Sequence, residues 1–521
     1  MADTDFLQKE PKEVWKYFSE ISSIPRCSTR EEGIRSYLVE QAKKRSLEYK
    51  TDAAGNLAVY VPASEGYESR PTAVIQGHMD MVCEKNSGTP HDFSRDPLKL
   101  KTQGDFLSAE GTTLGGDNGI ALAMALALLD TESPHGPLEL LFTSDEESGL
   151  TGALNLDPSL IRGRFLLNLD SEEEGVFYIG CAGGVTTVGD IPGEWEGAAA
   201  SASAGATQAA QAARAAQATQ AARAAETPES PAHEPSAAAF RLSITGLKGG
   251  HSGANIHEER GNAIKLGARL LRKLLQKTSL RISHIEGGGK HNAIPREFFA
   301  HFIAPAARKE EILAEAAETA RIFYTELGRI DPKCRVDIQE LSELPDRVLS
   351  EEATARLVNA LYLIPHGVDS MSRTIEGLVE TSSNLASVGI EEDRIRVTTS
   401  QRSSIISKRD DICGRVTAAL RTAGAEVDYL SPYPAWTPDP ENPLIDTCTG
   451  AYKRLFGQEP TVTAIHAGLE SGVIGEKFPE MNMISFGPNL YEVHTPEEHL
   501  SISSVEHIWR LLLKILEGLN L

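Results

Sequence analysis

The stretch Thr72-Ala-Val-Ile-Gln-Gly77 is a short apolar run that leads directly into His78-Met-Asp80. Two later runs end in the same way, Leu138–Thr143 before Ser144–Glu147 and Phe165–Leu169 before Asp170. Short apolar runs that stop at polar residues predict buried strands followed by loops. In open α/β sheets, ligands bind beyond the carboxyl ends of the strands. We therefore expect these histidine and acidic side chains to meet in one cleft.

The order of strand-like and helical patterns predicts two domains of different architecture. The two patterns alternate up to about residue 186, and the alternation returns near the end, with a strand expected at 481–486 and an amphipathic helix at 503–519. This is typical of a mostly parallel sheet covered by helices. The middle of the chain favours half-exposed strands and separate helices, at 240–245, 335–339, 261–276 and 308–326. We predict an α/β fold, with a three-layer domain formed by residues 1–186 and 432–521 and an inserted α+β domain at 187–431.

A low-complexity insertion, at about 197–239, lies inside the second domain. It is dominated by Ala, Gln, Ser, Thr and Arg and contains a proline-rich stretch near its end. Alanine favours helix, but the segment has no large apolar side chain to bury. We expect a solvated insertion between two strands, mobile or loosely helical. A helix that binds a partner is the alternative.

Length and charge narrow the classes of function. A chain of 521 residues is too long for one ordinary core and indicates two or three domains. The formal net charge of −23 argues against nucleic acid as a partner, because a polyanion requires a basic surface. The longest apolar stretch, residues 120–129, is only about half as long as a bilayer span, so no membrane partner is expected.

The amino terminus and the cysteines predict a cytoplasmic protein. Acidic residues in the first ten positions do not fit a secretory signal. The six cysteines lack Cys-x-x-Cys spacing, so the sequence predicts neither a disulfide framework nor a thiolate zinc site. A reducing cytoplasm agrees with both observations.

His78, Asp80 and Asp117 are candidates for a metal site. His78 and Asp80 are two residues apart at a strand end, so their side chains point the same way. One can bind a metal ion while the other orients it, because a ligating imidazole usually donates its second ring N–H to a carboxylate. A hydrogen-bonded surface pair is the alternative. Asp117, in the glycine-rich segment 114–119, is either a helix N-cap or a carboxylate that bridges two metal ions.

The acidic segment Asp145-Glu-Glu147 follows the strand expected at 138–143. Adjacent side chains diverge at such a boundary, so one glutamate can bind metal while its neighbour faces a water molecule as general base. Burial among other carboxylates would raise the pKa of that base towards neutral pH. A solvated acidic loop is the alternative, here and at 170–174. That alternative does not account for Asp170, which comes directly off an apolar strand.

Several blocks of the sequence resemble the co-catalytic di-zinc exopeptidase superfamily, which contains aminoacylases, glutamate carboxypeptidases and dipeptidases. The blocks are Gly77–Val82, Gly115–Ile120, Ser144–Glu147, Asn168–Asp170, Gly246–Gly253 and Val493–Glu497. Within the superfamily the chain is most similar to the bacterial aminoacyl-histidine (Xaa-His) dipeptidases. Three further blocks support this, Gly180–Gly184, His291–Arg296 and Ile465–Glu470. The resemblance covers nearly the whole chain except the Ala-rich insertion.

The resemblance implies a catalytic domain with two Zn²⁺ ions per chain, for which Mn²⁺ or Co²⁺ could substitute. Asp117 would be the bridging ligand, Asp80 would orient His78, and Glu146 would be the general base. The remaining ligands would be His78 and Asp170 for one ion, and Glu147 and His494 for the other. Cys83 departs from the family pattern, because a proline commonly stands there.

The inserted domain would then be a lid, and the chain a homodimer. In the superfamily a lid histidine stabilises the tetrahedral oxyanion, often across a dimer interface, and His251 matches it. A structural histidine in a glycine-rich turn is the alternative. Asn292 and Arg402 are candidates for binding the substrate carboxylate, although an exposed arginine is usually only solvated. The Ala-rich insertion lengthens this lid.

These residues imply a metallopeptidase that hydrolyses short peptides, in particular Xaa-His dipeptides such as β-Ala-His. The paired metal ions would activate a water molecule whose proton passes to Glu146 and then to the leaving amine. An aminoacylase, a deacylase or a tripeptide aminopeptidase of the same superfamily is the alternative enzyme. A non-catalytic metal-binding relative is disfavoured, because metal binding alone does not require Glu146.

Overall fold

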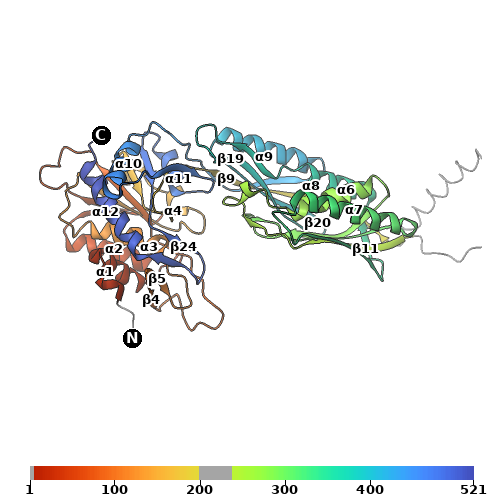
Figure 1. Cartoon of the computed structure of the whole chain (residues 1–521), viewed down its shortest axis with the longest axis horizontal. Helices are drawn as coiled ribbons and strands as arrows, with labels where there is room; N and C mark the ends of the chain where they lie inside the picture. The colour runs from red at the N-terminus through yellow and green to blue at the C-terminus, as the bar shows by residue number, and fades with distance from the viewer. Residues whose placement is uncertain (1–4, 199–236, 521) are drawn as a thin grey trace, which may run out of the picture. The chain divides into compact units, whose positions relative to one another are not determined.

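The computed structural model describes residues 5–198 and 237–520, which form two compact units (Figure 1). Unit 1 contains the chain up to Gly183 and from Tyr433 onwards, and unit 2 contains Gly184–Pro432. The insertion expected at about 197–239 falls mainly on residues 199–236, which lie outside the described residues. Its expected conformation therefore stays a prediction.

Unit 1 is built on an eight-stranded sheet, and most of its central pairs are parallel. The strands, in spatial order, are β1 (Glu48–Thr51), β2 (Leu57–Val61), β6 (Leu138–Thr143), β3 (Ala73–His78), β7 (Phe165–Asn168), β23 (Asn482–Ser485), β8 (Val176–Cys181) and β22 (Thr461–Ile465). Strand β3 pairs in parallel with β6 and β7, β7 with β23, and β8 with β22. The pairs β1–β2, β2–β6 and β8–β23 are antiparallel. The predicted mostly parallel sheet is confirmed.

Helices cover both faces of this sheet and complete three layers. One face packs against α1 (Lys12–Ser22), α2 (Glu32–Lys44), α3 (Gly116–Ala127), α10 (Pro443–Phe456) and α12 (Ile502–Gly518). The other packs against α4 (Thr151–Leu154) and α11 (Glu470–Lys477). Side-chain alternation makes this possible, since Ile75 of β3 belongs to the first core and Val74 to the second. Burying one such aliphatic side chain contributes roughly 1.5–3 kcal/mol to the free energy of unfolding.

A second, four-stranded sheet in unit 1 connects the C-terminal segment to an early part of the chain. Its order is β24 (Leu490–Tyr491), β25 (His499–Ser501), β5 (Phe106–Ala109) and β4 (Leu100–Gln103). Strand β25 pairs with β5, with His499 opposite Ser108. The residues just before β25 are thereby carried towards the loop that precedes α3.

Unit 2 combines one antiparallel sheet with a helical layer. The strand order is β16 (Arg335–Leu341), β11 (Ala237–Thr245), β15 (Phe298–Pro305), β13 (Arg281–Gly288), β19 (Val379–Glu391), β20 (Arg394–Ser403), β9 (Gly183–Pro192) and β21 (Glu426–Tyr433), and β18 (Gly367–Met371) also pairs with β19. The helices are α6 (Ala263–Leu275), α7 (Lys309–Leu327), α8 (Glu351–Leu363) and α9 (Ile406–Arg421). The predicted α+β architecture of the insertion is confirmed. Two short pairs complete it, β10 (Trp195–Gly197) with β17 (Arg347–Leu349) and β12 (Gly250–His251) with β14 (Ala293–Ile294).

Cys27 and Cys83 form a disulfide, so the prediction that the cysteines form none was wrong, and the cysteines no longer support a reducing cytoplasm. The two residues are 56 positions apart. They meet because Cys27 forms a parallel bridge with Met81, which places the segment after α1 beside the loop after β3. Spacing along the sequence carries no sign of this long-range pairing. The other cysteines, 181, 334, 413 and 448, are free thiols.

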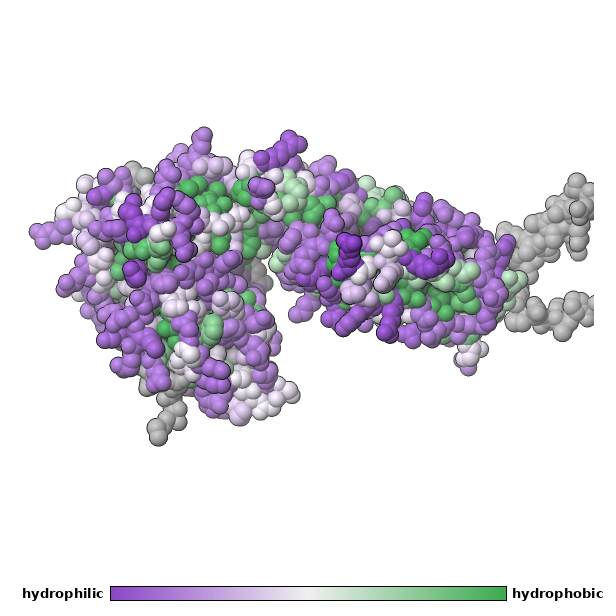
Figure 2. Space-filling model, in the orientation of Figure 1, coloured by the Kyte–Doolittle hydropathy of each residue, from purple (hydrophilic) through white to green (hydrophobic). Residues whose placement is uncertain are grey.

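The visible surface is mostly hydrophilic. On the face shown in Figure 2, hydrophilic residues predominate and apolar patches are smaller. The apolar run at 120–129 lies mainly in α3, which is buried in unit 1. Across residues 5–198 and 237–520, none of the helices is both long and apolar enough to span a bilayer.

Candidate active site

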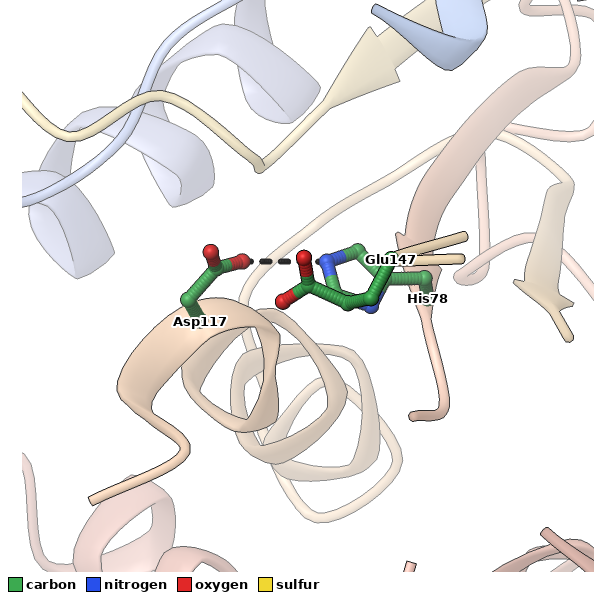
Figure 3. Close-up of side chains that lie close together, drawn as sticks. All are labelled: His78, Asp117 and Glu147. Atoms are coloured by element: carbon green, nitrogen blue, oxygen red, sulfur yellow. Dashed lines mark hydrogen bonds and ion pairs between the residues drawn. The ribbon is translucent and has the colours of Figure 1, made fainter. Parts of the chain in front are cut away.

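Strand β3 delivers His78 to the carboxyl edge of the sheet. The side chains of His78 and Asp80 are almost fully buried, at 1% and 0% exposure. His78 Nδ1 lies 3.3 Å from Asp80 Oδ1, and His78 Nε2 lies 3.0 Å from Asp117 Oδ1 (Figure 3). One ring nitrogen therefore faces Asp80 and the other faces the centre of the site. This is the arrangement of a ligating imidazole oriented by a carboxylate.

Asp80 also holds the loop that carries the paired glutamates. Its Oδ1 accepts a hydrogen bond from the Glu146 amide at 3.0 Å, and its Oδ2 accepts one from the Glu147 amide at 3.1 Å. The Ser28 hydroxyl donates to Oδ2 at 2.8 Å. Burial raises the pKa of Asp80, but its contacts with His78 and these donors outweigh burial and lower it to about 2. Asp80 is therefore ionised at neutral pH.

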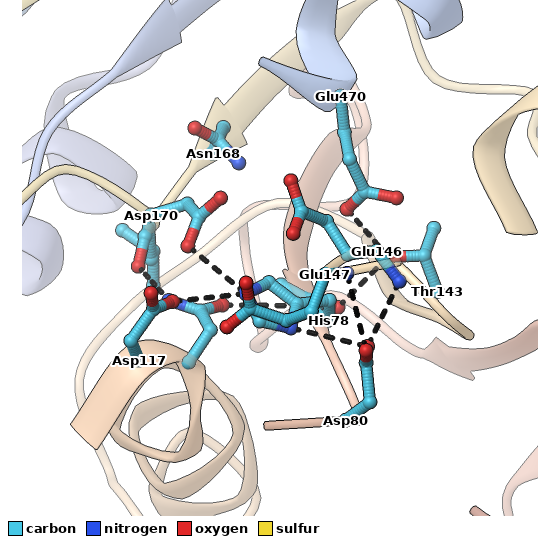
Figure 4. A network of polar contacts seen from close by, with 12 residues as sticks. His78, Asp80, Asp117, Thr143, Glu146, Glu147, Asn168, Asp170 and Glu470 are labelled. Atoms are coloured by element: carbon cyan, nitrogen blue, oxygen red, sulfur yellow. Dashed lines mark hydrogen bonds and ion pairs between the residues drawn. The ribbon is translucent and has the colours of Figure 1, made fainter. Parts of the chain in front are cut away.

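Asp117 lies between two histidines, of which Figure 4 labels His78. Its Oδ1 faces His78, and its Oδ2 lies 3.1 Å from His494 Nε2. Residue Gly115 occupies the N-cap position of α3, and Asp117 has a non-helical backbone conformation. Both carboxylate oxygens of Asp117 contact histidine nitrogens. A carboxylate with one oxygen towards each histidine has the geometry of a bridging ligand.

Two further carboxylates lie near the site, one beside each of the two histidines that contact Asp117. Asp170 Oδ1 lies 3.4 Å from His78 Nε2, and Glu147 Oε2 lies 2.9 Å from His494 Nε2. His78 and Asp170 thus gather on one side, and His494 and Glu147 on the other. Ligand atoms of His78, Asp117 and Glu147 all lie within 4.8 Å of one another. The structure brings together all five residues that the sequence suggested as metal ligands.

This set of side chains fits divalent metal ions. Imidazole nitrogens and carboxylate oxygens are the usual donors to zinc, and carboxylate-rich sites also accept manganese or cobalt. Glu147 Oε1 is buried and has no hydrogen-bond partner among the described residues. A buried carboxylate oxygen without a partner is costly unless a cation or donor compensates it. Three carboxylates so close together also repel one another, which a cation would offset.

The pKa values of these groups show how strongly they interact. Burial raises the pKa of Asp170 to about 6. Burial also raises the pKa of Asp117, but its contacts with His494 and His78 outweigh burial and hold it below the usual value. Hydrogen bonds to Asp117 and then to Glu147 raise the pKa of His494 to about 11. Metal binding must therefore displace a proton from His494, and affinity should depend on pH.

Glu146 is adjacent to Glu147 but makes none of the histidine contacts. Burial raises the pKa of Glu146 well above its usual value, His78 lowers it, and the carboxylates of Asp170 and Glu470 raise it further. The direction agrees with the expectation for a general base. A raised pKa makes this carboxylate a stronger proton acceptor than an ordinary glutamate.

The sequence did not reveal a chain of buried polar groups next to the site, of which Figure 4 shows Glu470, Thr143 and Asn168. Glu470 Oε2 accepts hydrogen bonds from Gln76 Nε2 and Thr143 Oγ1, both at 2.6 Å. Asn168 donates to Gln76 Oε1 at 2.5 Å, and Ser485 donates to Asn168. Burial raises the pKa of Glu470 to about 7. The available signal was a polar residue inside each apolar strand, Gln76 in β3 and Asn168 in β7.

His251 lies in unit 2, on the short strand β12. Its Nδ1 accepts hydrogen bonds from the amides of Gly253 and Ala254, at 3.3 and 3.1 Å. Burial, then the charges of Arg402 and His291, lower the pKa of His251 to about 4. The ring is therefore neutral at neutral pH. Because Nδ1 accepts, the ring proton must be on Nε2, which is left as a hydrogen-bond donor.

Asn292 and Arg402 are also in unit 2. The Asn292 carbonyl accepts a hydrogen bond from the Ser252 amide at 2.8 Å, which holds Asn292 beside the His251 loop. The side chain of Asn384 donates to the carbonyls on either side of Asn292, those of His291 and Ala293. Arg402, on β20, is only 7% exposed, so the interpretation as a solvated surface arginine is wrong. Its charge acts on the pKa of His251, which places the two in one polar neighbourhood.

Imidazoles and carboxylates at the carboxyl ends of parallel strands, with a separate carboxyl as base, are the kind of site that metal-dependent hydrolases use. Residues 74–518 match peptidase family M20/M25/M40. The chain belongs to this family and is a metallopeptidase.

Full-length relatives agree with this assignment. The cytosol non-specific dipeptidase of Escherichia coli (strain K12) is 36% identical over 518 residues, 99% of each chain. The crystal structure of aminoacylhistidine dipeptidase from Vibrio alginolyticus is 34% identical, with a TM-score of 0.85 over 99% of this chain and 98% of that chain. A tripeptidase from Staphylococcus aureus is 15% identical, with a TM-score of 0.53 over 98% of this chain and 99% of that one, and shares the fold.

Proposed function

We propose that the chain is a cytoplasmic dipeptidase that binds two Zn²⁺ ions and hydrolyses short peptides, Xaa-His dipeptides such as β-Ala-His among them. The proposal rests on how four side chains lie around Asp117. His78 faces one oxygen of Asp117 and lies beside Asp170, and His494 faces the other oxygen and lies beside Glu147. Two full-length relatives at 36% and 34% identity, both dipeptidases by name, support the substrate class. Manganese or cobalt would substitute for zinc, because carboxylate-rich sites discriminate weakly among metals.

Each proposed site residue of unit 1 then has a defined role. His78 and Asp170 would hold one ion, His494 and Glu147 would hold the other, and Asp117 would contribute to both sites. Bound metal would lower the pKa of the attacking water and polarise the scissile carbonyl. Glu146 takes the proton of the water as its oxygen bonds to the carbonyl carbon. Glu146 then returns this proton to the nitrogen as the C–N bond breaks.

The residues of unit 2 supply stabilisation and selectivity in this proposal. The Nε2–H of His251 donates a hydrogen bond to the carbonyl oxygen as negative charge develops on it. Arg402 and Asn292 bind the free carboxylate of the dipeptide, Arg402 through charge-assisted hydrogen bonds. The active form is a homodimer, as the family resemblance implies.

The first experiment compares substrates on metal-loaded protein. Rates with β-Ala-His, another dipeptide, a tripeptide and an N-acetyl amino acid are measured together with bound metal per chain. We expect two ions per chain and cleavage of dipeptides in preference to the other substrates. Faster deacylation would indicate an aminoacylase, and faster cleavage of the tripeptide an aminopeptidase. Two bound ions without any hydrolysis would indicate a non-catalytic relative.

A further inference from the structure

Glu498 binds the backbone of the loop that carries Asp117. Its side chain comes from the segment just before β25, and the residue is only 2% exposed. Oε2 accepts hydrogen bonds from the amides of Leu114 and Gly115, at 2.8 and 3.0 Å. Oε1 accepts from the amides of Gly116 and Asp117, at 2.8 and 3.3 Å. One buried carboxylate thus satisfies four consecutive backbone amides, an anion-binding arrangement known as a nest.

Arg26 contacts the same loop and is only 1% exposed. Its Nη2 donates a hydrogen bond to the Gly115 carbonyl. Its Nη1 donates to the carbonyls of Met79 and Asp80, at 3.2 and 2.8 Å. Arg26 therefore ties the loop before α3 to the loop after β3. Asp117 follows the first of these loops at the start of α3, and Asp80 lies in the loop after β3.

The glycines of the 114–119 segment make room for the two charged side chains. A Cβ atom on Gly115 would lie 2.5 Å from Arg26 Nη2, and one on Gly119 would lie at the same 2.5 Å distance from it. A Cβ atom on Gly116 would lie 3.3 Å from Glu498 Oε1. Gly115 also has a φ of 65°, in the left-handed region that favours glycine. The glycine-rich motif is thus a backbone cradle between Arg26 and Glu498.

We propose that Glu498 and Arg26 are positioning residues that set the Asp117 carboxylate between His78 and His494 before any metal ion binds. The inference rests on the proposed function, because it takes Asp117 as the shared metal ligand. A Gly-Gly segment has large conformational freedom, and fixing it on metal binding would weaken affinity. The amide and carbonyl contacts fix it beforehand. Neither residue needs to touch metal or substrate to act in this way.

The test compares metal affinity of Glu498→Gln and wild-type protein. A glutamine keeps one acceptor oxygen and presents an NH₂ group to two of the four amides, so at least two hydrogen bonds are lost. We expect affinity for Zn²⁺ and Co²⁺ to fall on the order of 10–100-fold, as for outer-shell partners of metal ligands. Chelator competition on metal-free protein measures this. The visible absorption spectrum of the Co²⁺ form should also change, because the ligand geometry is altered.

Glu139→Gln is the matched control. Glu139 is 4% exposed, and its Oε2 accepts hydrogen bonds from the amides of Arg162 and Gly163, at 2.9 and 3.0 Å. It lies near the amino end of β6, whereas Glu146 and Glu147 follow the carboxyl end. This variant removes a buried charge but keeps an oxygen that can accept from both amides, and it should keep wild-type metal affinity and spectrum. Equal loss of affinity in both variants would reduce Glu498 to a general stabilising role and overturn the inference.

Two further variants separate the possible failures. Glu498→Asp keeps the charge on a shorter side chain, and we expect an intermediate loss of affinity if the glutamine variant does not fold. Asp117→Ala should lose both ions in the same titration. If wild-type protein binds fewer than two ions, or Asp117→Ala retains both, the proposed function fails. If both behave as expected while the Glu498 variants bind like wild type, only the positioning role is overturned.

Discussion

Glu146 and Glu147 are adjacent and chemically identical, yet the fold places them in different surroundings. Glu147 contacts His494 at 2.9 Å, whereas burial raises the pKa of Glu146 well above its usual value. Asp80 fixes both by accepting hydrogen bonds from their backbone amides. The two side chains are thus held at the divergence expected where a strand passes into a loop. One suits metal binding and the other suits proton transfer.

We predict that Glu146→Gln retains close to two metal ions per chain but loses most turnover. The substitution removes a proton acceptor and leaves every proposed ligand in place. A positioned acid–base group contributes roughly 10²–10⁴-fold to the rate. Metal analysis and steady-state kinetics on the same preparation check this. Loss of metal from the variant, or turnover near that of wild type, would contradict the role of Glu146.

His251→Ala should lower kcat on the order of 10²–10³-fold, as removal of an oxyanion donor does in other enzymes. Metal content should stay unchanged, because His251 belongs to unit 2 and is not a proposed ligand. His251→Gln keeps a side-chain N–H donor and should recover part of the lost rate. A purely structural histidine would give the opposite pattern, with lower stability and unchanged kcat for the folded fraction.

At the same scale, the sequence located the metal-ligand candidates and Asp80, but not Glu498 or Arg26. His78 and Asp170 come directly off apolar runs, and Glu147 lies in the short loop after another, so their place at a sheet edge follows from local pattern. Glu498 and Arg26 act on backbone amides and carbonyls far away in the chain. No local pattern reports which backbone groups a charged side chain will meet. The tautomer of His251 likewise depends on two amides that only the folded loop presents.

At the scale of elements, periodicity located the long strands and helices that the sequence analysis named. The strand expected at 138–143 is β6, and the helix expected at 503–519 runs Ile502–Gly518. The two- and three-residue strands β24 and β25 escaped prediction, because they are too short to show a period. Their pairing nevertheless brings the C-terminal segment to the site. Short elements defined by long-range pairing are where sequence patterns fail.

Replacing Cys27 and Cys83 together with serine should destabilise the protein by roughly 2–4 kcal/mol, since a cross-link restricts the unfolded chain. Denaturant unfolding of protein purified without reductant measures the difference. Alkylation of the unfolded wild-type protein should find only the four thiols that are free in the fold. Six reactive thiols, or equal stability of the two proteins, would contradict the cross-link.

His366 should make unit 2 sensitive to acid. Its Nδ1 is 3.2 Å from the side-chain nitrogen of Asn262, the N-cap residue of α6, and burial followed by the charge of Lys265 lowers the pKa of His366 to about 3. The folded pKa is below the usual 6.5, so between these values the unfolded chain binds more protons. The contribution of His366 to the free energy of unfolding is therefore fully present above pH about 6.5 and is lost as the pH falls towards 3.

The comparison that checks this uses His366→Gln, which keeps a side-chain acceptor for Asn262 and does not titrate. Urea unfolding midpoints are measured at pH 7.5 and pH 5 with metal-free protein, following a signal from unit 2. Wild-type protein should lose more stability between these pH values than the variant. An identical loss in both would show that His366 does not contribute to the acid sensitivity.

At the scale of the molecule, the proposed site residues fall into two sets, one in each unit. The five proposed metal ligands and Glu146 belong to unit 1, and His251, Asn292 and Arg402 belong to unit 2. Two metal ions and one base could in principle cleave any amide. Substrate selectivity is therefore assigned in our proposal to residues other than the metal ligands. Arg402 is the proposed group for the substrate carboxylate, because a guanidinium binds a carboxylate through charge-assisted hydrogen bonds.

The last prediction concerns the substrate carboxylate. Converting the carboxylate of β-Ala-His to an amide should cost a charge-assisted hydrogen bond of roughly 1.5–3 kcal/mol, or more than about tenfold in kcat/KM. Arg402→Met should lower kcat/KM for the free dipeptide and largely abolish the difference between acid and amide. The double comparison separates loss of the contact from general damage, because damage would slow both substrates equally. Equal cleavage of acid and amide by wild-type protein would contradict a dipeptidase that recognises a free carboxylate and would favour an aminopeptidase.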